Sequence, residues 1–425
     1  MFSLIPTENW DYGFGDLMRG LPSAILSRGL ALHINIIGVG RCLPTRSARV
    51  GIALALKGLQ LRPGASVAVP LYCCPVVLRA IAEAGCRARF IEVEPYTYCM
   101  SATDLAAKSS EVDAVIAVHM FGNLCDVPAL RKAAPCKPII EDCAQAIGSR
   151  LEDRPTGSFG DIAVFSFRSG KYISAGEGGA VYSSSPEIES RLSKLISQLP
   201  VPSRRDEVVH VFTTCLRSML RTQPLWGLVG NALWSGYTRK VSPMSQASIV
   251  HSQIYQTDWD LIVRRMTILP AMIERQRWNA DYYTRNLTVD SGMICPEAPG
   301  TFFNRLQFPL LVPSAEQCHL LAKRLQRDRI STARPYKDIV AIAKERYGYS
   351  GDCPQSERIA KSVIVIPCNY ALGTAEVERI STCVSRAWAE IAGPEVTVNM
   401  PSNPSAVVSP PKEKLEHGCG PHHLS

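Results

Sequence analysis

Short apolar runs alternate with amphipathic stretches through the first half of the chain. The runs are rich in Val, Ile and Ala, which is typical of strands that are buried on both faces of a parallel sheet. The predicted strands are residues 66–70, 88–93, 113–118, 138–142, 161–167 and 180–183, and the predicted helices are residues 48–60, 75–85, 101–108, 127–134 and 188–199. This alternation predicts an α/β fold with a mostly parallel sheet flanked by helices.

The pattern changes after residue 200. Residues 211–234 are apolar and aromatic but are interrupted by Arg217, Arg221 and Pro224. A membrane-spanning helix needs about 20 uninterrupted apolar residues, so we do not expect one here. The favoured interpretation is a buried or subunit-packing pair of helices, and contact of residues 200–240 with a membrane surface is the less favoured alternative.

The last third of the chain predicts a smaller α+β domain. Residues 258–287 predict one long helix that is kinked at Pro270. The elements expected after it are a strand at 303–312, a helix at 315–327, an extended segment at 330–336, a strand at 362–366 and a helix at 374–391. We therefore expect an N-terminal segment (1–45), a large α/β domain (46–255) with an apolar insertion at about 200–240, a small domain (256–393) and a disordered tail (394–425), which is rich in Pro and Ser.

Composition narrows the class of protein. The net charge of +8 is spread along the chain without a basic block, so nucleic acid is not an expected partner. The 15 cysteines are odd in number and contain no CxxC pair, which argues against a disulfide framework and against a metal site. The first residues do not resemble a secretory leader, so we expect free thiols and a cytoplasmic location.

Residues 138–184 carry the candidate chemistry. One apolar run ends in Asp142, a second leads to Lys171, and the small residues 175–179 follow. Ligands of parallel sheets bind at the carboxyl ends of the strands, where these groups would meet. A desolvated lysine has a lowered pKa and becomes a nucleophile. A lysine that forms a Schiff base, together with an acid at a pyridine nitrogen, is the combination that pyridoxal phosphate uses.

A phosphate site is expected at the start of the first predicted helix. Residues 45–49, Thr-Arg-Ser-Ala-Arg, place free backbone N–H groups, hydroxyls and the positive end of the helix dipole together. These are the groups that bind a phosphate.

Four segments connect these residues to a known family: RPGASVAVPLYCCPVV, VHMFGNLCDVPAL, IIEDCAQAIGS and GSFGDIAVFSFRSGKYISAGEGGAVY. From about residue 46 to 179 the chain resembles the sugar aminotransferases of the DegT/DnrJ/EryC/StrS type, and residues 258–392 carry a weaker similarity. These enzymes depend on pyridoxal phosphate and have the aspartate aminotransferase fold (fold type I), with a large and a small domain.

The resemblance implies a role for several residues around the cofactor ring. Lys171 forms the Schiff base and moves the proton between substrate and cofactor. Asp142 pairs with the pyridine nitrogen, and Gln145 lies near the ring's 3-hydroxyl. Relatives that remove a sugar hydroxyl carry histidine in place of this lysine, so lysine at 171 implies amino transfer.

The resemblance also places the cofactor phosphate. Ser166 contacts it, and Ser47, Ala48 and Arg49 form the start of the phosphate-binding helix. Ala48 replaces the glycine that is usual in the family. The usual Gly-Tyr-Asn segment, which reaches the phosphate of the partner subunit, is missing from the corresponding residues 241–248. Ser242, Ser245 and Gln246 are candidate substitutes.

The ring-stacking position falls at Cys74, where many members carry an aromatic residue. Tyr72 and His119 are nearby candidates for stacking or for contact with the substrate. In the small domain, the candidates for contact with the substrate are Tyr336 and, for its phosphates, Arg334, Arg329 and Lys337.

The expected activity follows from the resemblance. An amino acid, with glutamate as the expected donor, aminates the cofactor, and a keto-sugar that is carried on a nucleotide accepts the amine. Such reactions belong to the biosynthesis of cell-surface polysaccharides or secondary metabolites, and a homodimer is expected. The alternatives are a cyclitol or another non-nucleotide ketone as the acceptor, and a non-catalytic regulator that keeps the fold.

Overall fold

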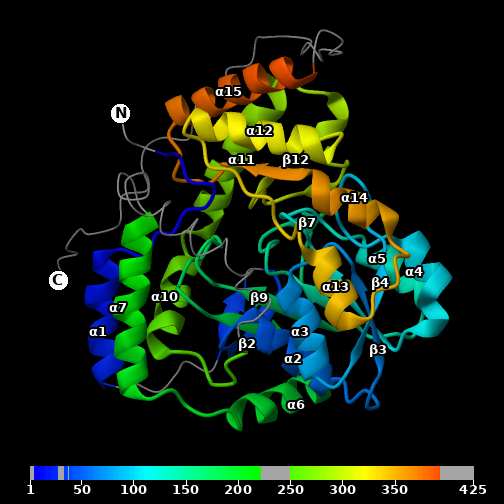
Figure 1. The fold of residues 1–425 in the computed structure, drawn as a ribbon. Coiled ribbons are helices and arrows are strands. Elements are labelled where there is room, and N and C mark those ends of the chain that lie inside the picture. The colour runs from blue at the N-terminus through cyan, green and yellow to red at the C-terminus, as the bar shows by residue number, and fades with distance from the viewer. Residues whose placement is uncertain (1–3, 27–32, 37, 222–248, 393–425) are drawn as a thin grey trace.

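An eight-stranded sheet lies at the centre of the computed structural model, which describes residues 4–26, 33–36, 38–221 and 249–392 (Figure 1). In spatial order its strands are β1 (Ile34–Ile36), β2 (Gly40–Thr45), β10 (Gly179–Tyr182), β9 (Ile162–Ser166), β6 (Ile139–Asp142), β5 (Ala114–Val118), β3 (Ser66–Pro70) and β4 (Arg87–Ile91). The strands from β9 to β4 pair in parallel, and β10, β2 and β1 add an antiparallel edge. The predicted α/β fold is confirmed.

Helices on both sides of the sheet explain why its strands are almost entirely apolar. Every residue of β5 and β6 is buried, including Glu141 and Asp142 at the end of β6. The helices of this half are α2 (Ala48–Gly58), α3 (Pro75–Glu83), α4 (Ala102–Lys108), α5 (Val127–Ala133) and α6 (Pro186–Ser197). Serine hydroxyls cap two of them, since Ser47 accepts from the N–H of Val50 and Ser185 accepts from the N–H of Ile188.

The start of α2 is pressed against β10. A Cβ at Gly179 would lie 2.6 Å from Ala48 N and 2.8 Å from Thr45 Oγ1, closer than real Cβ atoms come. Glycine at 179 is therefore required for the helix start to sit beside the strand.

Gly179→Ala should destabilise the protein for this reason. The added methyl group would push the start of α2 away from β10, at a cost of about 1–3 kcal/mol in the free energy of unfolding. Gly15→Ala in α1 (Phe14–Leu26) is the matched control, because its added Cβ would meet nothing within 4 Å. Urea unfolding monitored by circular dichroism measures both, and equal midpoints for the two variants would contradict the tight contact.

The predicted long helix at 258–287 is wrong. The chain forms two helices, α10 (Gln256–Met266) and α11 (Leu269–Asn286), with Thr267 and Ile268 between them. Pro270 lies in the first turn of α11, where its missing N–H costs no hydrogen bond. Proline thus begins a helix here and does not kink one.

Residues 204–221 form an amphipathic helix. Helix α7 (Arg204–Arg221) begins at the charged residues that precede the predicted apolar stretch, and it packs beside α1 at one side of the molecule (Figure 1). Among the described helices, none combines the length and the apolar character that crossing a membrane requires. The rest of the predicted insertion, residues 222–240, lies outside the described residues, so contact of this segment with a membrane surface stays a prediction.

The carboxyl-terminal part contains a second, smaller sheet. Strands β12 (Phe308–Leu311) and β13 (Val363–Ile366) pair antiparallel, beside α12 (Ala315–Arg327) and α15 (Thr374–Ala392) (Figure 1). Helices α13 (Ile339–Tyr347) and α14 (Pro354–Ser362) and the short strands β7 (Arg150–Leu151), β8 (Arg154–Pro155) and β11 (Thr301–Phe302) were not predicted. The domain boundaries stay a prediction, and the expected tail lies outside the described residues.

Candidate active site

The candidate residues meet at the carboxyl ends of the parallel strands. Asp142 is the last residue of β6 and pairs with Val118 at the end of β5 on one side. On the other side, Ser166 is the last residue of β9. Because these strands run in parallel, the polar groups that follow them share one edge of the sheet.

Lys171 reaches this edge through a tight hairpin after β9. The N–H of Phe167 donates to Gly178 O, and the N–H of Ala175 donates to Phe167 O, each at 2.9 Å. Burial, aided by the cation of Arg168, lowers the pKa of Lys171 to about 8. A substantial fraction of the amine is therefore neutral and nucleophilic near pH 8.

Asp142 presents one carboxylate oxygen without a protein partner. Its Oδ1 accepts from the N–H of Ala144 at 3.0 Å, and within the described chain Oδ2 makes no hydrogen bond. Burial raises the pKa of Asp142, although Lys171 acts in the opposite direction. A protonated ring nitrogen at Oδ2 would supply the cationic hydrogen bond that this buried acid lacks.

Gln145 is held between two loops of the site. Its Oε1 accepts from the N–H of Phe121 at 3.2 Å, and its Nε2 lies 3.4 Å from the hydroxyl of Tyr336. The hydroxyl of Tyr72 donates to Pro335 O at 3.0 Å and so fixes the segment that carries Tyr336. Tyr336, which lies between α12 and α13 in the carboxyl-terminal part of the chain, is therefore next to Gln145.

The groups expected at a phosphate also lie together. Ser47, the cap of α2, pairs with Gly178, and Ser166 pairs with Gly179. The hydroxyl of Ser166 has no hydrogen bond within the described chain. The N–H of Arg49 is among the first-turn donors that an α-helix leaves unbonded.

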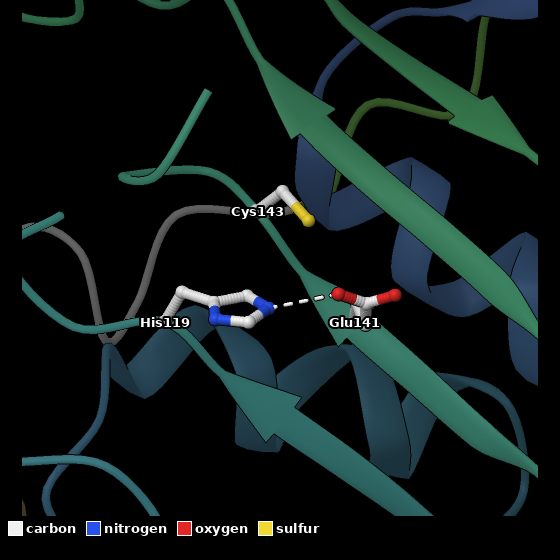
Figure 2. Close-up of side chains that lie close together, drawn as sticks. All are labelled: His119, Glu141 and Cys143. Atoms are coloured by element: carbon white, nitrogen blue, oxygen red, sulfur yellow. Dashed lines mark hydrogen bonds and ion pairs between the residues drawn. The ribbon is translucent and has the colours of Figure 1, made fainter. Parts of the chain in front are cut away.

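A buried trio, His119, Glu141 and Cys143, lies close together at the ends of β5 and β6, where Glu141 and Cys143 flank Asp142 in the chain (Figure 2). The N–H of Cys125 donates to His119 Nδ1 at 3.0 Å, so Nε2 carries the proton and donates to Glu141 Oε2 at 3.0 Å. Both oxygens of Glu141 also accept backbone N–H groups from residues 157–160. The ligand atoms of His119 and Glu141 are therefore already occupied, and this pair forms a hydrogen-bond network that fixes two loops.

The sequence that contains these residues matches the profile of a known protein family. The profile of the DegT/DnrJ/EryC1/StrS aminotransferase family matches residues 31–385. The chain belongs to this family. As a member it is a transaminase that depends on pyridoxal phosphate.

Individual members of the family are also similar to this chain. A UDP-N-acetyl-3-dehydro-alpha-D-glucosamine 3-aminotransferase of Acidithiobacillus ferrooxidans is 25% identical over 88% of this chain and 92% of its own. An L-glutamine:2-deoxy-scyllo-inosose aminotransferase of Streptoalloteichus tenebrarius is 32% identical over 37% of this chain and 38% of its own. The crystal structure of the aminotransferase TlmJ from Streptoalloteichus hindustanus has a TM-score of 0.72 at 22% identity and covers 92% of this chain and 100% of its own, which confirms the fold.

The site fits the cofactor of the DegT/DnrJ/EryC1/StrS family. Asp142 offers a free carboxylate oxygen, Lys171 offers a desolvated amine, and the first turn of α2 leaves backbone N–H groups unbonded. A chain that acted only as a regulator would not need this set, and the family assignment favours an enzyme over that alternative.

Two residues that were expected near the substrate lie behind the site. Tyr72 and His119 are almost completely buried, and protein groups occupy their polar atoms. Their placement differs from the substrate role expected for them and favours a supporting role. Cys74 is half-buried at the start of α3, and its place at the ring face stays a prediction.

The expected cations of the small domain are not gathered at the site. Nη2 of Arg334 donates to Lys361 O at 2.6 Å. Lys337 pairs with Asp338 at 2.8 Å, and Arg329 is exposed on another turn. Ser242, Ser245 and Gln246 lie outside the described residues, so the substitution for Gly-Tyr-Asn stays a prediction.

Sequence reasoning missed Glu8 and Arg168. Glu8, in the amino-terminal segment, lies against the loop that carries Lys171. A Cβ added to Gly170 in this loop would lie only 2.6 Å from Glu8 Oε2. The charge of Glu8 raises the pKa of Lys171, against the effects of burial and Arg168. No pattern in the first residues signals the contact of Glu8, whereas Arg168 could have been considered because it lies two residues after the candidate Ser166 and three before Lys171.

Covalent capture of pyridoxal phosphate by the apo-protein should depend on pH with a midpoint near 8. The neutral amine is the reactive form, so the capture rate should rise as the pH increases through about 8 and then level off. Stopped-flow absorbance of the bound cofactor measures the rate. A rate that continues to rise towards the ordinary lysine value of 10.5 would contradict the desolvation of Lys171.

Proposed function

We propose that this aminotransferase moves an amino group from glutamate, or a closely similar amino acid, to a keto-sugar that is carried on a nucleotide. The observation that carries the proposal is the presence of two groups in one site: the desolvated amine of Lys171 and the carboxylate of Asp142, whose Oδ2 is free. The name of the Acidithiobacillus relative, which spans most of the chain, supports a UDP-linked acceptor. We further propose a role in cell-surface polysaccharide or secondary-metabolite biosynthesis, in the cytoplasm.

In this proposal some residues of the site carry out acid–base chemistry and others position the cofactor. Bound pyridoxal phosphate supplies an electron-withdrawing ring that makes the substrate's C–H bond acidic. Asp142 Oδ2 holds the proton on the ring nitrogen. Lys171 Nζ, when neutral, accepts the proton from the substrate carbon and returns it as a general acid. Gln145, fixed by Phe121 and Tyr336, orients the ring from its side.

The two half-reactions can be tested separately. The holoenzyme is first incubated with glutamate or glutamine, and absorbance follows conversion of the cofactor to its aminated form. The aminated enzyme is then mixed with UDP-, GDP- and dTDP-linked keto-sugars, and mass spectrometry detects an amino-sugar product. We expect conversion with glutamate and a product with one nucleotide-linked ketone. A holoenzyme that no amino acid converts would contradict amino transfer itself.

A cyclitol acceptor is the second candidate. The Streptoalloteichus relative acts on 2-deoxy-scyllo-inosose by name, with L-glutamine as the donor, and its similarity covers only 37% of this chain. Including free scyllo-inosose ketones in the screen separates the two candidates. Product from a cyclitol and none from any sugar nucleotide would replace the first proposal.

We also propose a homodimer in which α7 contacts a second copy of the chain. Val209, Phe212, Leu216 and Met219 on α7 are 47–59% exposed. Their alternating spacing of three and four residues forms a narrow seam, which is typical of helix–helix packing and not of the wider apolar face that lies on a membrane. Light scattering after gel filtration should give twice the chain mass. A monomer that floats with anionic vesicles would favour the membrane alternative.

A further inference from the structure

The first described residues of the chain form a strap that is attached at both of its ends. We call residues 4–13 the amino-terminal strap and residues 167–178 the lysine loop. At one end of the strap, the N–H of Ile5 donates to Arg329 O, and Ile5 O accepts from the N–H of Ser331, each at 2.9 Å. At the other end the strap continues into α1, which packs beside α7 and α10.

Between these attachments, Asp11 is the centre of a buried polar cluster. Its Oδ1 accepts from Nη1 of Arg265 at 2.6 Å, and its Oδ2 accepts from the hydroxyl of Tyr370 at 2.5 Å. Arg265 is only 7% exposed, and it also donates to Ser174 O at 2.8 Å and pairs with Asp16 at 2.9 Å. The cluster therefore ties the strap to the lysine loop and to the segment that carries Tyr370.

The two residues next to Lys171 contact the same strap and cluster. Glu8 of the strap lies so close to Gly170 that an added Cβ would be 2.6 Å from its Oε2. On the other side of the lysine, the ring of Tyr172 stacks on that of Tyr370, with centroids 6.2 Å apart. The backbone on both sides of Lys171 is thus held by residues from outside the lysine loop.

The strap also contributes to the charge around the amine of Lys171. Burial has the largest effect on the pKa of this lysine and lowers it, and the cation of Arg168 acts in the same direction. Glu8, Asp142 and Cys74 raise the pKa, and among these three the charge of Glu8 has the largest effect. A negative charge near an amine stabilises its protonated form.

We propose that the amino-terminal strap positions Lys171, with Glu8 as the positioning residue beside it and the hydrogen bond between Asp11 and Tyr370 as the clamp that holds the strap. The inference rests on the proposed role of Lys171 as the amine that captures the cofactor. A loop without regular backbone pairing samples several conformations, and only the fraction with a correctly placed amine can react. In this role Glu8 acts through the lysine and not on the substrate.

Glu8→Gln tests the positioning residue. Glutamine keeps the size of the side chain and removes a charge that raises the pKa of Lys171, so capture of pyridoxal phosphate by the apo-protein should reach its plateau at a lower pH than in the wild type. Stopped-flow absorbance measures the midpoint. Glu152→Gln changes an exposed glutamate between β7 and β8 and should leave the midpoint unchanged. An unchanged midpoint in Glu8→Gln would overturn the role of Glu8.

Tyr370→Phe tests the clamp, because it keeps the ring that stacks on Tyr172 and removes the hydroxyl that donates to Asp11. At the pH of the plateau, capture should slow about tenfold as the fraction of correctly placed amine falls. Hydrogen exchange in the lysine loop should become faster. Tyr283→Phe is the matched control, since it removes a buried hydroxyl that donates to a backbone oxygen at 2.8 Å in the core of the small sheet. It should lower the melting temperature without slowing capture.

Borohydride labelling of the wild type separates this inference from the proposed function. A label on Lys171, together with wild-type capture in both strap variants, would overturn the role of the strap alone. A label on a different lysine would overturn the proposed role of Lys171 and this inference with it. Neither capture nor hydrogen exchange needs turnover, so a chain that aminates none of the tested ketones could still confirm the strap.

Discussion

Replacing Lys171 with alanine should reduce amino transfer by at least about a thousandfold. In the proposed mechanism the amine of this residue captures the cofactor and moves the proton during transfer, and acid–base groups of this kind contribute about 10²–10⁴ in rate. The variant should also lose the absorbance of the covalently held cofactor while it keeps its melting temperature. Removing this amine should not weaken the fold, since burial and the cation of Arg168 already disfavour its charged form and lower its pKa to about 8.

Lys194→Ala is the matched control, because that lysine is exposed on α6 and far along the chain from the site. It should retain full activity and the cofactor absorbance. An active Lys171→Ala enzyme would show that another amine carries the chemistry.

Asp142→Asn should lower kcat by about a hundredfold or more and weaken the binding of pyridoxal phosphate. Asparagine keeps the shape of the side chain and can still accept from the N–H of Ala144, so the local fold should persist. The negative charge at the ring nitrogen is lost, and loss of one preorganised electrostatic partner typically costs about 10²–10³ in rate. Steady-state kinetics and a cofactor titration measure the two effects.

Asp153→Asn is the control for this substitution, since Asp153 is exposed in the turn between β7 and β8. Its kinetics should match those of the wild type. A Asp142→Asn enzyme with wild-type kcat would mean that the ring nitrogen does not depend on this acid.

Local patterns predict the central sheet well, and they indicate the candidate site residues, whose roles stay a prediction. Buried strands such as β3 are almost continuous apolar runs, and the polar residue that ends a run, such as Asp142, marks the edge where ligands bind. Lys171 was identified because it follows such a strand and precedes a run of small residues. These features lie within a few residues of one another in the sequence, so they can be recognised without knowledge of the tertiary structure.

Long-range contacts could not be predicted in the same way. Glu8 approaches Lys171 from a segment more than a hundred residues away along the chain, and its sequence carries no periodic pattern. The break between α10 and α11 was misjudged because a proline can end, kink or begin a helix, and only the packing around it decides. The burial of His119 and Tyr72 could not be predicted either, because a polar residue at a strand end can face a ligand or support a neighbouring loop.

The most direct test of the account is to locate the cofactor on the chain. The holoenzyme is treated with borohydride, which fixes the bound cofactor as a stable amine, and tryptic peptides are then sequenced by mass spectrometry. The account predicts a single phosphopyridoxyl label, on Lys171. A label on a different lysine, or no label on a protein that has been saturated with pyridoxal phosphate, would contradict it.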